Sequence, residues 1–231
     1  MKNKQSITES INWLFEQAPY FSINDLRESL PEYKPDTLKS YLSRQKKAGK
    51  IFDAGRGWYS SIAEPYRLDT VPVEKLVGEL KSVFPLLDFA CWSTAQLNEM
   101  LRHQLAKHVQ FAYVERDAID SVADWLRENG YRPWANPGKK ERKSFVVEEN
   151  TVVVLPLVSK SPHENGFASY GKIVVDVLAD AADLSIINIP EFISGAKNAI
   201  SSQRIDISIL KSYAMRREAN ILELEKGTTI H

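Results

Sequence analysis

Cysteine is almost absent from this sequence of 231 residues, and the single one, Cys91, excludes an internal disulfide framework. A chain without disulfides is typical of a reducing cytosol. Long apolar runs are also missing, since the longest, residues 152–158, contains Pro156 and is far too short to span a bilayer. No apolar signal region with a cleavage site precedes the first helical pattern. We therefore expect a cytoplasmic protein that does not enter a membrane.

The chain also lacks a net charge, because 30 Lys and Arg residues balance 30 Asp and Glu residues. The whole molecule therefore gives no indication of a polyanionic partner. The distribution is more informative: residues 34–56 contain seven basic side chains against two acidic ones, Asp36 and Asp53. The remainder of the chain must be net acidic, so the basic segment is a local feature that favours contact with an anionic partner.

Signatures of catalysis and of metal binding are missing as well. We find no Gly-x-Ser-x-Gly elbow and no Gly-x-Gly-x-x-Gly loop. The histidines do not have the spacing of a metal site, and only one cysteine could assist them. They are His103, His108, His163 and His231. The sequence therefore predicts no catalytic residue, no metal and no cofactor.

One segment, residues 166–172, has the glycine and lysine spacing of a phosphate-binding P-loop. The next residue is Ile173, where that motif needs Ser or Thr to hold magnesium, so we interpret the segment as the start of a helix. On that helix Lys172, Asp176 and Asp180 lie at steps of four and share one stripe. An intrahelical ladder of ion pairs is the structural interpretation, and a contact or acid–base site is the functional alternative.

The first 60 residues hold three short helical patterns, over residues 7–18, 22–30 and 34–48. Pro19 ends the first, and Ser22 is a good cap for the second. A compact hairpin pattern follows, with strands over residues 50–53 and 58–60 and a Gly-Arg-Gly turn between them. This order is typical of a winged helix-turn-helix, in which one helix enters the major groove of double-stranded DNA and a β-ribbon contacts the backbone beside it.

The third helix indicates which side chains would meet the duplex. Leu38, Tyr41 and Leu42 gather on one side, whereas the opposite side carries small hydroxyls and cations. Such a face can approach phosphates and still offer donors to base edges. At the hairpin tip, two glycines would let Arg56 approach the duplex closely. The predicted DNA-binding residues are Lys39, Ser40, Ser43, Arg44, Lys46, Lys47 and Arg56.

Beyond the hairpin the periodicity fades, and residues 63–72 are predicted to form a linker. We expect an α+β fold in which a winged helix-turn-helix domain, residues 1–62, is followed by a larger mixed α/β domain with a small sheet, residues 73–231. Helical patterns in the larger domain cover residues 73–83, 93–101, 116–129, 169–182, 190–201 and 207–217. Strand patterns cover residues 87–91, 109–114, 145–147 and 151–158.

The winged-helix start and two later segments, Tyr-Gly-Lys-Ile-Val-Val-Asp-Val-Leu at 170–178 and Ile-Ser-Ile-Leu-Lys-Ser-Tyr-Ala-Met-Arg-Arg at 207–217, resemble a known family. They are similar to the antitoxins of the abortive-infection E type (AbiEi-like), which belong to type IV toxin–antitoxin pairs. The resemblance implies a DNA-binding autorepressor whose larger domain counteracts a nucleotidyltransferase-like toxin. We expect it to act on its own promoter as a homodimer.

Two other functions stay open at this point. A mixed sheet with scattered carboxylates is compatible with a divergent nucleotidyltransferase or nuclease-like enzyme that the N-terminal domain directs to DNA. The acids available for two-metal chemistry would be Asp88, Glu115, Glu149 and Asp176, although no closely spaced acidic pair lies on a predicted strand. Alternatively, the larger domain is a non-catalytic adaptor that binds a protein or a small ligand.

Overall fold

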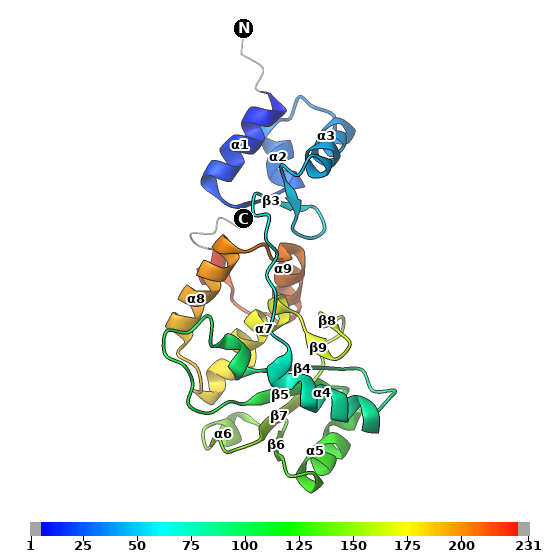
Figure 1. Cartoon of the computed structure of the whole chain (residues 1–231), viewed down its shortest axis with the longest axis vertical. Helices are drawn as coiled ribbons and strands as arrows, with labels where there is room; N and C mark the ends of the chain where they lie inside the picture. The colour runs from blue at the N-terminus through cyan, green and yellow to red at the C-terminus, as the bar shows by residue number, and fades with distance from the viewer. Residues whose placement is uncertain (1–5, 226–231) are drawn as a thin grey trace.

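The computed structural model describes residues 6–225, which form two parts stacked along the long axis of the molecule (Figure 1). The N-terminal part holds three helices and a three-stranded antiparallel sheet, in the order β1-β3-β2. Its elements are α1 (Ile7–Gln17), β1 (Tyr20–Ser22), α2 (Ile23–Ser29), α3 (Pro35–Lys47), β2 (Phe52–Asp53) and β3 (Trp58–Ser60).

Local sequence accounts for most of these boundaries. Ser6 and Ser22 each begin a helix with a capping box, in which the serine accepts from a backbone amide three residues on. Pro35 occupies the first turn of α3, where the missing amide hydrogen has no cost. The three predicted helices and the hairpin are therefore confirmed to within about two residues. No sequence pattern predicts strand β1, because three buried residues are too short to display alternation.

The second part is built on a six-stranded mixed sheet in the order β6-β7-β5-β4-β9-β8. Strands β6, β7 and β5 run parallel, β4 is antiparallel to β5, and β9 pairs in parallel with β4. The strands are β4 (Phe89–Ser93), β5 (Gln110–Val114), β6 (Arg132–Ala135), β7 (Thr151–Pro156), β8 (His163–Glu164) and β9 (Phe167–Ala168). The helices are α4 (Val71–Val83), α5 (Ile119–Glu128), α6 (Lys139–Arg142), α7 (Tyr170–Asp176), α8 (Ile189–Ser202), α9 (Ile207–Arg216) and α10 (Leu222–Glu225).

Successive side chains of the central strands point to opposite faces of this sheet, and each face therefore carries a core. In β5, Ala112 and Val114 pack with α4 and α5, whereas Phe111 and Tyr113 pack with α7, α8 and α9 on the other face. Every residue of β4 is buried, as expected for a strand covered by helices on both sides. The α+β class is thus confirmed, with a larger mixed sheet than the small one predicted.

Several details of the second part differ from the predictions. Residues 145–147, predicted as a strand, have no regular structure, and the predicted helix over residues 93–101 is reduced to a 3-10 turn, Thr94–Leu97. The sequence pattern also misses β6, which contains Pro133 and lies at the edge of the sheet, where a residue without an amide hydrogen is tolerated. Strands β8 and β9 have two residues each, too few for any periodic signal.

The segment predicted as a linker is hydrogen-bonded to the second part. Pro65 forms a parallel β-bridge with Arg204. The amide of Tyr66 donates to the Arg204 carbonyl at 2.9 Å, and the Arg204 amide donates to the Glu64 carbonyl at 2.7 Å. The connection between the two parts is therefore fixed and not free. Among the helices described, none is both long enough and apolar enough to cross a bilayer.

Candidate nucleic-acid interface

The basic face of α3 (Lys39, Ser40, Ser43, Arg44, Lys46 and Lys47) is open to solvent. All six side chains are exposed, whereas Leu38 and Leu42 on the opposite side are fully buried against α1 and α2. Figure 1 places α3 in the N-terminal part, at the end of the molecule away from the six-stranded sheet. The face that the sequence predicts to meet DNA is therefore presented by a rigid, well-packed helix.

Two cations of this face have a carboxylate partner within the N-terminal part. Lys46 Nζ lies 2.8 Å from Asp53 Oδ2 in β2, and Lys39 Nζ lies 3.8 Å from Asp36 Oδ1. Exposed pairs of this kind contribute at most about 1 kcal/mol, so a phosphate can replace the carboxylate at little cost. The Lys46–Asp53 pair also joins the C-terminal end of α3 to the hairpin.

The hairpin tip, residues 55–57, contacts the second part of the molecule. The Arg56 side chain is exposed, but its backbone amide donates to Ser208 Oγ in α9 at 3.0 Å. Gly55 has a φ of 101°, and a Cβ atom there would lie 2.1 Å from Asp206 Oδ1. The close approach that Gly55 allows is thus made to the N-terminal end of α9, whereas the Arg56 side chain is exposed to solvent.

Further contacts fix how the two parts sit together. The Ile207 amide donates to the Ala54 carbonyl at 2.9 Å. The Tyr20 hydroxyl donates to the Gln203 carbonyl at 2.9 Å and accepts from the Ile205 amide at 3.1 Å. Tyr20 and Ala54 belong to the same apolar core as α7, α8 and α9. The orientation of α3 relative to the second part is therefore set by buried contacts.

A second concentration of charge lies inside the second part, on the stripe that the sequence indicates. Lys172 Nζ lies 2.7 Å from Asp176 Oδ2, and both side chains are completely buried. The Tyr213 hydroxyl completes the pair, since it accepts from Lys172 Nζ at 2.9 Å and donates to Asp176 Oδ1 at 2.8 Å. The intrahelical pair is present as predicted, but in the interior and not on a solvated surface.

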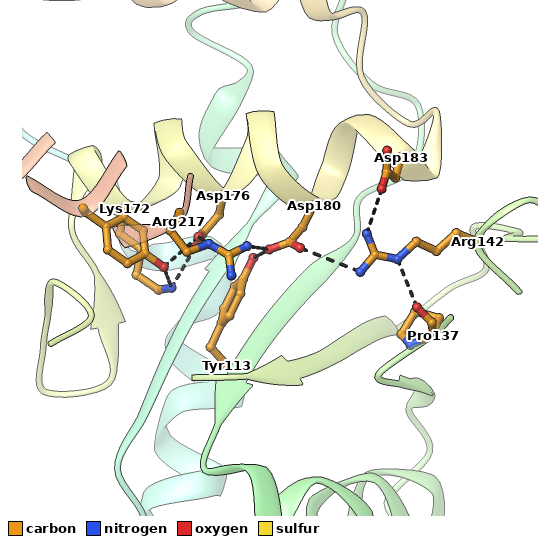
Figure 2. Close-up of polar contacts among 9 residues, drawn as sticks. Tyr113, Pro137, Arg142, Lys172, Asp176, Asp180, Asp183 and Arg217 are labelled. Atoms are coloured by element: carbon orange, nitrogen blue, oxygen red, sulfur yellow. Dashed lines mark hydrogen bonds and ion pairs between the residues drawn. The ribbon is translucent and has the colours of Figure 1, made fainter. Parts of the chain in front are cut away.

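The cluster continues along the helix to Asp180, as Figure 2 shows. Arg217 donates to Asp180 and lies 3.7 Å from Asp176. Tyr113 of β5 donates to Asp180 Oδ2 at 2.9 Å. Asp180 lies in a π-helical turn, Val177–Ala181, that follows α7 directly. We call Lys172, Asp176, Asp180 and Arg217 the buried ion cluster. It joins α7 to the end of α9, and Arg142, which lies 3.8 Å from Asp180 and 3.1 Å from Asp183, extends the pairing to α6.

Burial and ion pairing shift the pKa values of Lys172 and Asp176 in opposite directions. Burial lowers the pKa of Lys172 and raises the pKa of Asp176, while the charge of each partner counters the shift in the other. The Lys172 ammonium also lies 3.6 Å from the centre of the Tyr113 ring. Because these charged groups pair with one another away from solvent, the cluster is suited to holding α7 and α9 together.

The fold does not gather the four acids considered for two-metal chemistry into one cluster, although Asp88 and Glu115 both lie directly beyond the Phe89–Val114 pair that ends the β4–β5 ladder. Asp88 pairs with the His163 ring at 2.9 Å, Glu115 precedes a 3-10 turn, Glu149 lies in a turn, and Asp176 is buried in the ion cluster. Within residues 6–225, no group of three or more His, Cys, Asp or Glu side chains could hold a metal ion.

The P-loop-like segment also takes another form. It comprises the turn after β8, strand β9 and the first residues of α7. Ser169 caps α7 by accepting from the Lys172 amide, and the Lys172 ammonium is directed to Asp176. No side chain of this segment is therefore arranged around a phosphate.

The chain belongs to DUF6577, a family of unknown function, and the model of that family matches residues 37–228. The match begins within α3 and includes the hairpin and nearly all of the second part. No curated protein matches the chain.

Proposed function

We propose that this member of DUF6577 binds double-stranded DNA through residues 6–62, which act as a winged helix-turn-helix. The order of elements supports the proposal. Helices α2 and α3 are joined by a short turn, the hairpin β2–β3 follows at once, and β1 pairs with β3 on its other side. A helix-turn-helix followed by a β-ribbon is the arrangement that places one helix in the major groove beside a backbone-contacting strand pair.

The observation that carries the proposal is the exposed basic face of α3. Lys39, Arg44 and Lys47 stand clear of the second part and can each reach a phosphate. Ser40 and Ser43 lie between them, and their short hydroxyls can donate to or accept from base edges. A face with both kinds of group suits sequence-dependent binding, so we propose a transcription regulator that acts as a homodimer on its own promoter.

The test is a titration of a duplex from the region upstream of the coding sequence, followed by fluorescence anisotropy at several salt concentrations. The triple variant K39A/R44A/K47A should bind more weakly, and the slope of log K against log salt should fall by about 0.9 for each phosphate that is no longer neutralised. The matched control is K139A/K140A/K143A, which removes three exposed lysines from the distant α6 region. Equal weakening in both variants, or none in the first, would contradict the proposal.

The role as an antitoxin is a second proposal, and it rests on the resemblance alone. The cations of α3 lie outside the apolar cores of the second part, so the role of that part can be tested in a variant that lacks these cations. Co-expression with the product of the adjacent gene is the experiment. If the second part neutralises a toxin, K39A/R44A/K47A should still restore growth although it no longer binds DNA. Failure of that variant to restore growth would assign the effect to DNA binding.

A further inference from the structure

We propose that the DNA-contacting surface continues from α3 across the hairpin tip onto the exposed side of α9. The cations that would contact the phosphate backbone there are Arg56, Lys160, Lys211 and Arg216, which we call the α9 track. This inference rests on the proposed function and extends it, because three of the four cations belong to the second part of the molecule. It assigns to that part a direct, sequence-independent contribution to DNA binding.

The first step is the continuity between α3 and α9. The Lys46–Asp53 pair joins the end of α3 to β2, and the Arg56 amide joins the hairpin tip to Ser208. The tip cannot draw nearer to α9, since Gly55 already leaves no room for a Cβ atom beside Asp206. The Arg56 side chain and the N-terminal end of α9 therefore lie on one surface.

The second step is the helical register of α9. Its buried residues are Ile207, Leu210, Tyr213 and Ala214. The opposite side carries Ser212, Met215 and Arg216, all exposed, with Lys211 at its margin. From Ser208 to Arg216 this side is about 12 Å long, at roughly 1.5 Å per residue. That length spans several phosphates of a duplex, which carries one charge per roughly 1.7 Å of axis.

The third step is that these cations are held beside the tip and beside one another. Lys211 Nζ lies 5.3 Å from the centre of the Trp58 ring in β3. Arg216 donates from its guanidinium to the Lys160 carbonyl at 3.0 Å, which places Lys160 next to the far end of α9. Lys160 and Arg216 are both exposed.

The cations on α9 do not reflect the overall charge of the second part. Residues 57–231 contain 20 basic and 23 acidic side chains, so cations gathered on one side of α9 oppose the net charge of their own domain. The acids next to α9 in the sequence are Glu218, exposed two residues beyond Arg216, and Asp206, which caps the helix by accepting hydrogen bonds from the Ile209 amide and the Ser208 hydroxyl. The charge of Asp206 is offset by the positive end of the helix. Exposed cations without a built pocket suit a polyanionic backbone, and the contact between the hairpin tip and α9 places them beside the duplex that α3 would bind.

The experiment compares duplexes of two lengths with the full chain. One has about 12 base pairs centred on the site bound by α3, and the other is extended to about 24 base pairs. The variant K160Q/R216Q keeps side-chain donors but removes two charges. On the long duplex we expect it to bind roughly tenfold more weakly at low salt, with a salt slope smaller by about 1.8. On the short duplex it should bind as the wild type does.

The matched control is K139Q/K140Q, which removes two exposed charges from α6 and should change neither duplex. Equal affinity of K160Q/R216Q and wild type for the long duplex would overturn the α9 track while leaving binding by α3 intact. Equal weakening on both duplexes would also overturn it, because the effect would not depend on flanking DNA. If the wild type binds neither duplex, the proposed function itself fails, and the inference fails with it.

Discussion

The backbone amide of Ile207 donates a 2.9 Å hydrogen bond to the carbonyl oxygen of Ala54, and so joins the first residue of α9 to the hairpin. A backbone contact of this kind depends on the path of the chain and not on a flexible side chain. Together with the Tyr20 hydroxyl, which bonds the backbone on both sides of Arg204, it makes the two parts of the molecule a single unit. We therefore expect the two parts to unfold together.

The contact between Gly55 and Asp206 can be tested by adding one methyl group. G55A should lower the free energy of unfolding by roughly 3 kcal/mol or more, because the new Cβ atom would displace the Asp206 carboxylate from the cap of α9. The control is G49A, since Gly49 also has a positive φ, of 65°, but no atom within 4 Å of the place that a Cβ atom would take. We expect G49A to cost roughly 1–2 kcal/mol, from backbone strain alone. Equal costs in urea denaturation would show that position 55 is not crowded.

The buried ion cluster predicts strong coupling between Lys172 and Asp176. K172M should destabilise the fold by about 3–5 kcal/mol, because it leaves Asp176 charged in the interior. The double variant K172M/D176L should recover much of that stability, since no unpaired charge remains near α7. Urea denaturation of the wild type, the single variants K172M and D176L, and the double variant gives the coupling energy between the two residues.

The exposed ion pair Asp124–Arg127, whose charged atoms lie 2.6 Å apart, provides the comparison for this coupling energy. Replacing both of its residues by alanine should change the free energy of unfolding by no more than about 1 kcal/mol. If the buried and exposed pairs gave similar coupling energies, Lys172 and Asp176 would have to be hydrated in solution.

Buried and partly buried tyrosines predict a decrease in stability at alkaline pH. Burial raises the pKa of Tyr66 to about 12, and raises the pKa values of Tyr113, Tyr170 and Tyr213 as well. Below about pH 10 both states keep these protons, so the full stability is present. Above about pH 10 the unfolded chain releases protons that the folded chain retains, and the free energy of unfolding falls as pH rises.

Urea midpoints at about pH 9 and about pH 11 test this expectation, with tyrosinate absorbance recorded in parallel. The absorbance should rise together with unfolding. Titration of all the tyrosines with a midpoint near pH 10 in a chain that stays folded would contradict the assigned burial.

Local signals are sufficient to predict the three helices and the hairpin of the N-terminal part, but not strand β1. Pro19, the Ser22 cap and the glycines at 55 and 57 set the ends of its elements, and each acts within a few residues of its own position. The exposed basic face of α3 can also be predicted, because helical periodicity separates it from the buried Leu38 and Leu42.

Features that depend on distant pairing cannot be predicted in this way. Strand β9 is a strand because its two residues pair with β4 and β8, and nothing in Phe167 and Ala168 alone indicates that. The stripe of Lys172 and Asp176 is visible in the sequence, but its burial follows from Tyr213 and Arg217, which come from a later segment. The fixed connection between the parts resembles a linker in sequence because its contacts with residue 204 leave no periodic pattern.

The tight fit of Gly55 against Asp206 also bears on how such proteins can diversify. Proteins whose domains are joined by flexible linkers can exchange a domain by recombination, since each domain folds independently of the next. Here the hairpin of the N-terminal part packs so closely against α9 that Gly55 leaves no room for one methyl group. Transfer of the N-terminal part between relatives should therefore succeed only when the residues of α9 that contact it are transferred as well.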